Sequence, residues 1–175
     1  MNLKKIFFSV LTFLFISINF LNAEDKVSYI DIDNILTNTH AGKLLLTALK
    51  EEENSKIDKF KLTDQDFKND ELKILAKKNL ISKQEINKSL KELNIKYQDY
   101  KKNKIKEIES LKSKRNRNIV RFLNLINPII EKYMAENSIY ILMDKKNVFI
   151  ASKDYDITNN LIELIDNQIK TFEIK

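Results

Sequence analysis

The feature that most constrains this chain is a long stretch without helix-breaking residues. Neither glycine nor proline occurs between residues 43 and 127, and the whole chain of 175 residues contains one of each. Average usage would give about 12 glycines and about 9 prolines in a chain of this length. Because these two residues most often end helices and form turns, the stretch predicts long, continuous helices.

An apolar repeat within this stretch indicates how the helices associate. Apolar side chains recur in alternating steps of four and three residues, which is the 3.5-residue repeat of a coiled-coil seam. The repeat slips by about one residue in the middle, and such a slip is expected to change the supercoil locally. Its two parts are Ile86, Leu90, Leu93, Tyr97 and Tyr100, and then Ile119, Phe122, Ile126, Ile129 and Tyr133.

A second amphipathic helix is predicted before this repeat, over about residues 42–78. Asn79–Ser82 separates the two helices, and Ser82 with Glu85 has the spacing of a capping box that starts a helix. Two amphipathic helices joined by a short turn fold back on each other. At 1.5 Å per residue, the first of them would be roughly 55 Å long. We therefore predict a helical-hairpin arm over residues 45–118.

Two residues are expected to interrupt or end the return helix. Pro128 lacks an N–H group, so it should bend the helix or let Asn127 begin a new one. Asn137 tolerates the left-handed conformation that ends helices. A last helix is predicted over about residues 158–170, with Asp156 or Thr158 as its cap.

Strand patterns lie on both sides of the arm. Val27–Asp33 alternates as a strand does, and Ile139–Asp144 and Val148–Ala151 follow the return helix. The predicted fold is mainly α with a small β body (α+β), in which the arm is inserted between strand 1 and strands 2–3. Residues 24–44 and 119–175 form this body.

A three-stranded sheet is a small body for such a long arm, so it is expected to complete its core by oligomerising. The apolar residues of the body are therefore candidates either for its core or for a subunit interface. They are Tyr29, Ile30, Ile32, Ile141, Met143, Phe149 and Leu164. On the arm, the apolar repeat is interpreted as the hairpin seam. A second interpretation applies to three aromatic residues, which could instead face a bound partner: Phe60, Phe67 and Tyr100.

The first 23 residues indicate the compartment. Lys4 and Lys5 precede an apolar run, Ile6–Leu21, which ends in Leu-Asn-Ala before Glu24. A basic start, a short apolar core and a small residue at the cleavage point are typical of a secretory signal peptide. We predict cleavage after Ala23, with an uncleaved membrane anchor as the alternative.

Five segments in this order resemble the Skp/OmpH family of periplasmic chaperones. They are Asn34–Lys43, Ile126–Ile130, Met143–Asp144, Val148–Ala151 and Asp156–Thr158. The resemblance covers about residues 27–170 and includes the insertion of an arm into a strand-containing body.

This resemblance implies a homotrimer in the periplasm. Its small bodies would associate through their strands, and three arms would surround a cavity. Unfolded outer membrane proteins would be held there without ATP before membrane insertion. No cofactor is implied, and the sequence has no glycine-rich loop that would cradle a nucleotide phosphate.

Catalysis is the weakest alternative. The chain has no cysteine and one histidine, His40, at the start of the first arm helix. Asp31 and Asp33 have no nucleophile, base or metal-ligand set beside them in the sequence, and they fit better as sheet-edge or capping residues. We therefore do not expect an enzyme or a metal site.

A basic stretch, Lys83–Arg121, offers a binding alternative. It is densest at Lys112, Lys114, Arg115 and Arg117. Such a patch attracts phosphates, although a charged helix face is often only solvated. In a secreted protein, anionic lipid or lipopolysaccharide is a more plausible partner than nucleic acid. The alternative function is thus an envelope coiled-coil scaffold that binds anionic lipid or lipopolysaccharide.

Overall fold

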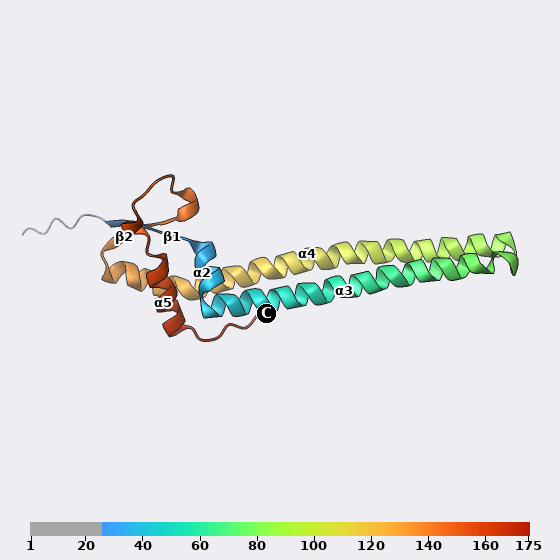
Figure 1. The fold of residues 1–175 in the computed structure, drawn as a ribbon, viewed down its shortest axis with the longest axis horizontal. Coiled ribbons are helices and arrows are strands. Elements are labelled where there is room, and N and C mark those ends of the chain that lie inside the picture. The colour runs from blue at the N-terminus through green and yellow to red at the C-terminus, as the bar shows by residue number, and fades with distance from the viewer. Residues whose placement is uncertain (1–25) are drawn as a thin grey trace, which may run out of the picture.

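The computed structural model describes residues 26–175, so the predicted signal peptide over residues 1–23 lies outside the described residues. A small body stands at one end of a long helical hairpin (Figure 1). The elements are β1 (Lys26–Ile30), α2 (Ile32–Asn38), α3 (His40–Ala76), α4 (Lys83–Glu136), β2 (Ile139–Asp144) and α5 (Thr158–Gln168), with short 3₁₀ turns at Lys77–Asn79, Lys145–Asn147 and Lys153–Tyr155.

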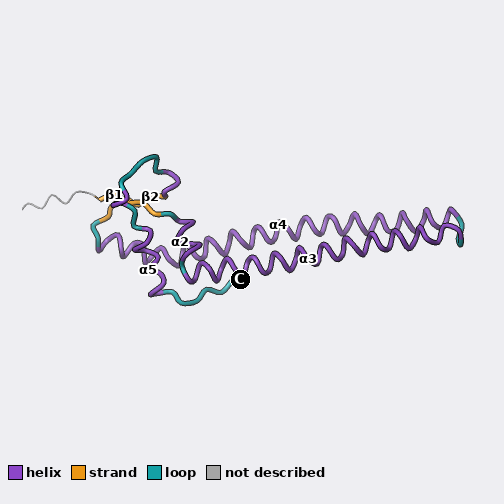
Figure 2. The backbone as a smooth tube through the Cα atoms, viewed as in Figure 1, coloured by secondary structure: helices purple, strands orange, loops and turns teal. Residues whose placement is uncertain are grey.

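Helices α3 and α4 form the predicted arm (Figure 2). The capping box at the tip is confirmed, because the Ser82 hydroxyl accepts a bond from the Glu85 N–H at 3.2 Å and the Glu85 carboxylate accepts one from the Ser82 N–H at 3.0 Å. The return helix continues through Pro128 as one element. The prediction that Asn127 could start a new helix is therefore wrong, because the helix is held on both sides of the proline by buried Ile126 and Ile129.

The seam of the arm keeps its spacing beyond Tyr100, the last residue of the first apolar repeat, as far as Asn118. The 3.5-residue spacing from Tyr100 runs on through Lys104, Leu111, Lys114 and Asn118, which are the less exposed residues of this stretch. Asn118 is fully buried, whereas Ile119, where the sequence repeat resumes, is only half-buried. Polar side chains occupy seam positions here, and the slip of one residue falls after Asn118, where the buried positions Asn118, Phe122 and Ile126 follow in two consecutive steps of four.

Within residues 26–175 the sheet has two strands, not the three predicted. β1 and β2 are parallel, with Val27 opposite Ile141 and Ile30 opposite Asp144. Parallel strands need a long crossover connection, and the arm with α2 supplies it. Val148–Ala151 is not a strand, because the chain turns away at the 3₁₀ turn Lys145–Asn147.

The free side of β1 is instead contacted by a later segment. Tyr29 forms an isolated parallel bridge with Asp156, and the Ile157 N–H donates to the Tyr29 carbonyl at 3.1 Å. β1 is also shorter than predicted, because Asp31 leaves the strand to cap α2 by accepting a bond from the Asn34 N–H at 2.9 Å.

Helix ends differ from the predictions in detail. The left-handed residue after α4 is Ser138, with φ of 54°, and not Asn137, whose side-chain amide bonds back to the Tyr133 carbonyl at 2.8 Å. The residue preceding α5 is Ile157, and the Asp156 carboxylate accepts a bond from the Thr158 N–H at 3.0 Å. Asp156, the residue before Ile157, therefore supplies the predicted side-chain cap of α5.

The hydrophobic core lies where α2, α5 and the roots of α3 and α4 meet (Figure 1). Its fully buried side chains include Ile35, Leu45, Phe122, Leu161 and Ile165. The segment after α5 turns back along the arm root, and Phe172 and Ile174 pack against the same core. The body and the arm therefore share one core, which fixes the direction in which the arm leaves the body.

Candidate functional site

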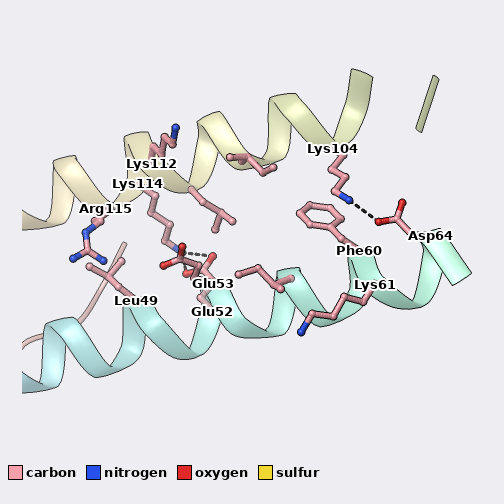
Figure 3. Close-up of a pocket in the computed structure, with 13 residues that line it drawn as sticks. Leu49, Glu52, Glu53, Phe60, Lys61, Asp64, Lys104, Lys112, Lys114 and Arg115 are labelled. Carbon is pink, nitrogen blue, oxygen red and sulfur yellow. Dashed lines mark hydrogen bonds and ion pairs between the residues drawn. The ribbon is translucent and has the colours of Figure 1, made fainter. Parts of the chain in front are cut away.

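The part of the arm nearer the body contains an opening between its two helices (Figure 3). The cavity has a volume of about 310 Å³ and is partly open to solvent. Ion pairs stand at its two ends: Lys114 Nζ lies 2.7 Å from Glu52 Oε2, and Lys104 Nζ lies 2.7 Å from Asp64 Oδ2. The residues lining it are Leu49, Glu52, Glu53, Ile57, Phe60, Lys61, Asp64, Lys104, Ile108, Leu111, Lys112, Lys114 and Arg115.

Aromatic side chains close the seam beyond this cavity. The ring centroid of Phe67 lies 5.2 Å from that of Tyr97 and 5.3 Å from that of Tyr100. The Tyr100 hydroxyl donates to the Phe60 carbonyl at 3.0 Å, and Phe60 is buried. Phe60, Phe67 and Tyr100 therefore belong to the seam, and they hold the helices together rather than offering free apolar surface.

Charges at the distal end of the cavity are mutually stabilised. The hydrogen bond from Lys104 lowers the pKa of Asp64 below its usual value, and the same bond raises the pKa of Lys104. Burial raises the pKa of Tyr100 beside them. All three groups consequently keep their ordinary charge states at neutral pH, and Lys104 is held charged in a position that a coiled coil normally gives to an apolar residue.

The predicted body residues fall into two classes. Tyr29 and Ile30 are buried in the body, while Ile32 and Leu164 are half-buried against its core. In contrast, Phe149 is fully exposed in the single chain, Ile141 is 54% exposed and Met143 is 37% exposed. These three apolar side chains contribute nothing to the core of this chain, so only the interface prediction remains for them.

Two of these exposed side chains, Met143 and Phe149, line a hollow beside the sheet, whereas Ile141 does not. An open cavity of about 1030 Å³ is lined by residues from β1 and β2 and by the loop 147–155. Met143, Phe149 and Ile150 are among the lining residues, and Ile150 is 84% exposed. Exposed apolar side chains gathered in this way are typical of an association surface.

The four basic residues predicted to meet an anionic surface are not equivalent. Lys114 points into the arm and pairs with Glu52 (Figure 3). Lys112 and Arg115 line the cavity but are exposed, and Arg117 is exposed further along α4. Three of the four therefore remain candidates for contact with an anion.

The residues considered for catalysis have structural partners. The His40 N–H donates to Asp166 Oδ1 at 2.7 Å, which joins the start of α3 to α5. Asp31 caps α2, and the hydrogen bond from the Asn34 N–H lowers its pKa. Asp33 lies 2.8 Å from the Lys146 ammonium. Helix capping and ion pairing thus account for the two aspartates, whereas His40 makes its contact through the main chain and its side chain is exposed.

Comparison with known families decides the identity of the chain. The family model described as outer membrane protein (OmpH-like) matches residues 26–165. The chain belongs to the OmpH-like family. This match confirms the family resemblance that the five short segments of the OmpH-like protein indicated.

A solved structure shows that the fold is shared as well. A candidate outer membrane chaperone (OmpH-like) from Caulobacter crescentus CB15 superposes with a TM-score of 0.76 at 17% sequence identity, and the match covers 85% of this chain and 88% of that one. No curated protein matches the sequence of this OmpH-like protein significantly. Within residues 26–175, none of its helices is both long and apolar enough to cross a membrane.

Proposed function

We propose that this OmpH-like protein is an ATP-independent holdase chaperone of the periplasm. It binds unfolded outer membrane β-barrel proteins and prevents their aggregation before membrane insertion. The observation that carries the proposal is the arm, whose two helices return to a single body and share its core. A passive rod would not need both ends anchored in this way, whereas one wall of a container does.

The surface of the arm is suited to shielding such clients from aggregation. A β-barrel protein outside the membrane exposes unpaired strand edges and apolar side chains, which drive aggregation. The outer surface of the arm carries many charged side chains and scattered exposed apolar ones such as Leu62, Leu72, Ile95 and Ile105. Many weak contacts on such a surface would shield a client without selecting one sequence.

The container requires several arms, and we propose a homotrimer assembled through the bodies. The exposed side chains of Ile141, Met143 and Phe149 support this assembly, because apolar side chains exposed in one chain would be buried between chains. Export by the signal peptide over residues 1–23 would place the trimer where unfolded outer membrane proteins pass.

The test is protection of a denatured β-barrel protein on dilution into buffer without nucleotide. Turbidity should stay near zero at about one assembled oligomer per client. The mass of the assembly should be measured by light scattering at the same concentration. Turbidity equal to that of the client alone would refute the holdase proposal.

Ile141→Asp is expected to abolish assembly while leaving the single chain folded. Ile141 lies on β2 and is 54% exposed, so a charge there is tolerated in the monomer but would be buried without a partner between subunits. Light scattering should return the monomer mass, with helix content by circular dichroism unchanged.

The matched control for this change is Ile105→Asp, at an isoleucine that is 57% exposed on the arm. The control should assemble normally. If Ile141→Asp also assembles, the proposed interface lies elsewhere.

The alternative function, an envelope scaffold that binds anionic lipid or lipopolysaccharide, is favoured by the exposed basic residues of α4. Reversing Lys112, Arg115 and Arg117 to Glu should weaken binding to anionic vesicles at least fivefold, and wild-type binding should fall with salt. The control reverses three other exposed lysines of α4, at positions 88, 91 and 96, with the same change in net charge. Equal loss in both variants would indicate a non-specific charge effect.

A further inference from the structure

The segment that follows α5 has the side-chain pattern of an amphipathic strand. Residues 169–175, here called the tail, leave α5 and cross the root of the arm (Figure 1). Phe172 and Ile174 are half-buried against the core, whereas Thr171, Glu173 and Lys175 are exposed. Alternate side chains therefore face the protein, as in a strand that lies on an apolar surface.

Asn118 of α4 binds the main chain of this tail. Its Nδ2 donates to the main-chain oxygen of Lys175 at 2.9 Å, and its Oδ1 accepts from the Lys175 N–H at 3.0 Å. Both main-chain groups of one residue are thereby paired, as they are opposite a hydrogen-bonded residue of an antiparallel strand. The Asn118 side chain is fully buried, so its amide is a fixed feature of the arm root.

Arg121, one turn further along α4, completes the contact. Its Nη1 donates to the Glu173 carbonyl at 3.3 Å and to Asn118 Oδ1 at 2.9 Å. The same guanidinium lies 5.4 Å from the Phe172 ring centroid, and that ring packs edge-on against Phe122 at 6.0 Å. The polar contacts thus go to main-chain atoms, while the apolar contacts need only an aromatic side chain at the right position.

We propose that this arm-root groove, formed by Asn118, Arg121 and Phe122, is a strand-recognition site for clients that the tail occupies in the free protein. The proposal rests on the function proposed above. Strands of outer membrane β-barrels alternate apolar and polar side chains, which is the pattern of residues 171–175. A groove that reads main-chain groups and one aromatic side chain accepts many such strands.

Occupation by the tail would restrict the site to clients that are already held by the arms. A tethered segment competes at an effective concentration of about a millimolar, so single weak strands would not displace it. A client held by the arms has a comparable local concentration and would displace it. The empty groove, which exposes Phe122 and the Asn118 amide, would then not persist without a client.

The first test releases the tail without touching the groove. Phe172→Ser with Ile174→Ser removes the two apolar contacts of the tail. A fluorescent peptide with the sequence of residues 169–175 should bind this variant at least tenfold more tightly than wild type. A rearranged peptide of the same composition, with Phe and the two Ile adjacent, should bind the variant at least tenfold more weakly than the peptide in the native order. Ile105→Ser with Leu62→Ser, at exposed arm positions, is the matched control and should bind like wild type.

The second test removes the groove in the released-tail protein. Asn118→Leu should lower peptide affinity at least tenfold, because it leaves the peptide main chain unpaired. Because Asn118 is buried, its replacement could also disturb folding, so Arg121→Gln is the second variant. It leaves Asn118 unchanged and should still lower peptide affinity at least threefold. An unfolded β-barrel protein should displace the peptide from the released-tail protein.

The outcomes separate this proposal from the holdase function. No gain of peptide binding on tail release, equal binding of the rearranged peptide, or no displacement by the client would overturn the strand-recognition site, even if wild-type protein suppresses turbidity. Peptide binding with client displacement supports the site. Failure to suppress turbidity would overturn the holdase function alone, since peptide binding is measured separately.

Discussion

Replacing Gly42 by alanine is expected to destabilise the protein by about 2–3 kcal/mol. A Cβ atom at this position would lie 2.7 Å from Thr39 Oγ1 and closer still to the carbonyl oxygen of Leu36. The Thr39 hydroxyl is held in place, because it caps α3 by accepting from the Gly42 N–H at 3.2 Å and donates to the Ile35 carbonyl at 2.8 Å. The Leu36 carbonyl belongs to the main chain of α2 and cannot rotate away as a side chain could. The junction of α2 and α3 would have to open, and the gain in helix propensity offsets only about 1 kcal/mol of this cost.

Thermal unfolding followed by circular dichroism measures the effect. A loss of this size should lower the melting temperature by about 5–10 °C in a chain of this length. Wild type and variant must be compared at equal protein concentration, because assembly would shift the midpoint. Asn54→Ala, at an exposed position of the same helix, is the control and should change stability by less than about 0.5 kcal/mol. Equal stability of Gly42→Ala and this control would contradict the close approach.

Shortening the arm is expected to abolish client protection while the body stays folded and assembled. Removing residues 53–73 and 87–107 deletes three heptads from each helix, so the seam keeps its phase. The tip turn and its Ser82–Glu85 capping box remain, as does the Glu52–Lys114 ion pair at the arm root. Shielding by many weak contacts scales with the surface of the arm, so most of the holding capacity should disappear.

Turbidity during dilution of a denatured β-barrel protein measures this loss. The short-armed protein should need at least tenfold more material for equal protection, while light scattering confirms unchanged assembly. The single change Ile105→Ser, at an exposed residue of the removed segment, is the control and should cost less than twofold. If the short-armed protein protects as well as wild type, clients are not held by the arms.

Local patterns were sufficient for the helices of this protein. The spacing of apolar residues over 86–133, the Ser82–Glu85 box and the absence of breakers predicted both arm helices and their turn, and the structure has them. These features depend on contacts between residues three or four apart, or on the residues of one cap. A sequence displays such contacts directly.

Pairing and burial within the body were not predictable in the same way. Val148–Ala151 has the composition of a strand, yet the position beside β1 is taken by Asp156. Ile139 and Ile141 would share a face in a regular strand, but the pairing shifts register between them, with Lys26 opposite Ile139 and Val27 opposite Ile141. The alternation of β2 therefore did not distinguish buried Ile139 from exposed Ile141. Which segment pairs with which is decided by competition among distant segments, and that competition leaves no periodic signal.

The sequence by itself determined that this protein has a long helical hairpin set into a small strand-containing body, and its short segments were enough to indicate the family. Only the tertiary structure decided the parallel pairing of β1 with β2, the close approach at Gly42 and the arm-root groove. Asn118 appeared in the sequence merely as a gap in an apolar repeat. Its partner Lys175 is 57 residues away in the chain, and a contact over that distance is created only when the tail folds back onto the arm.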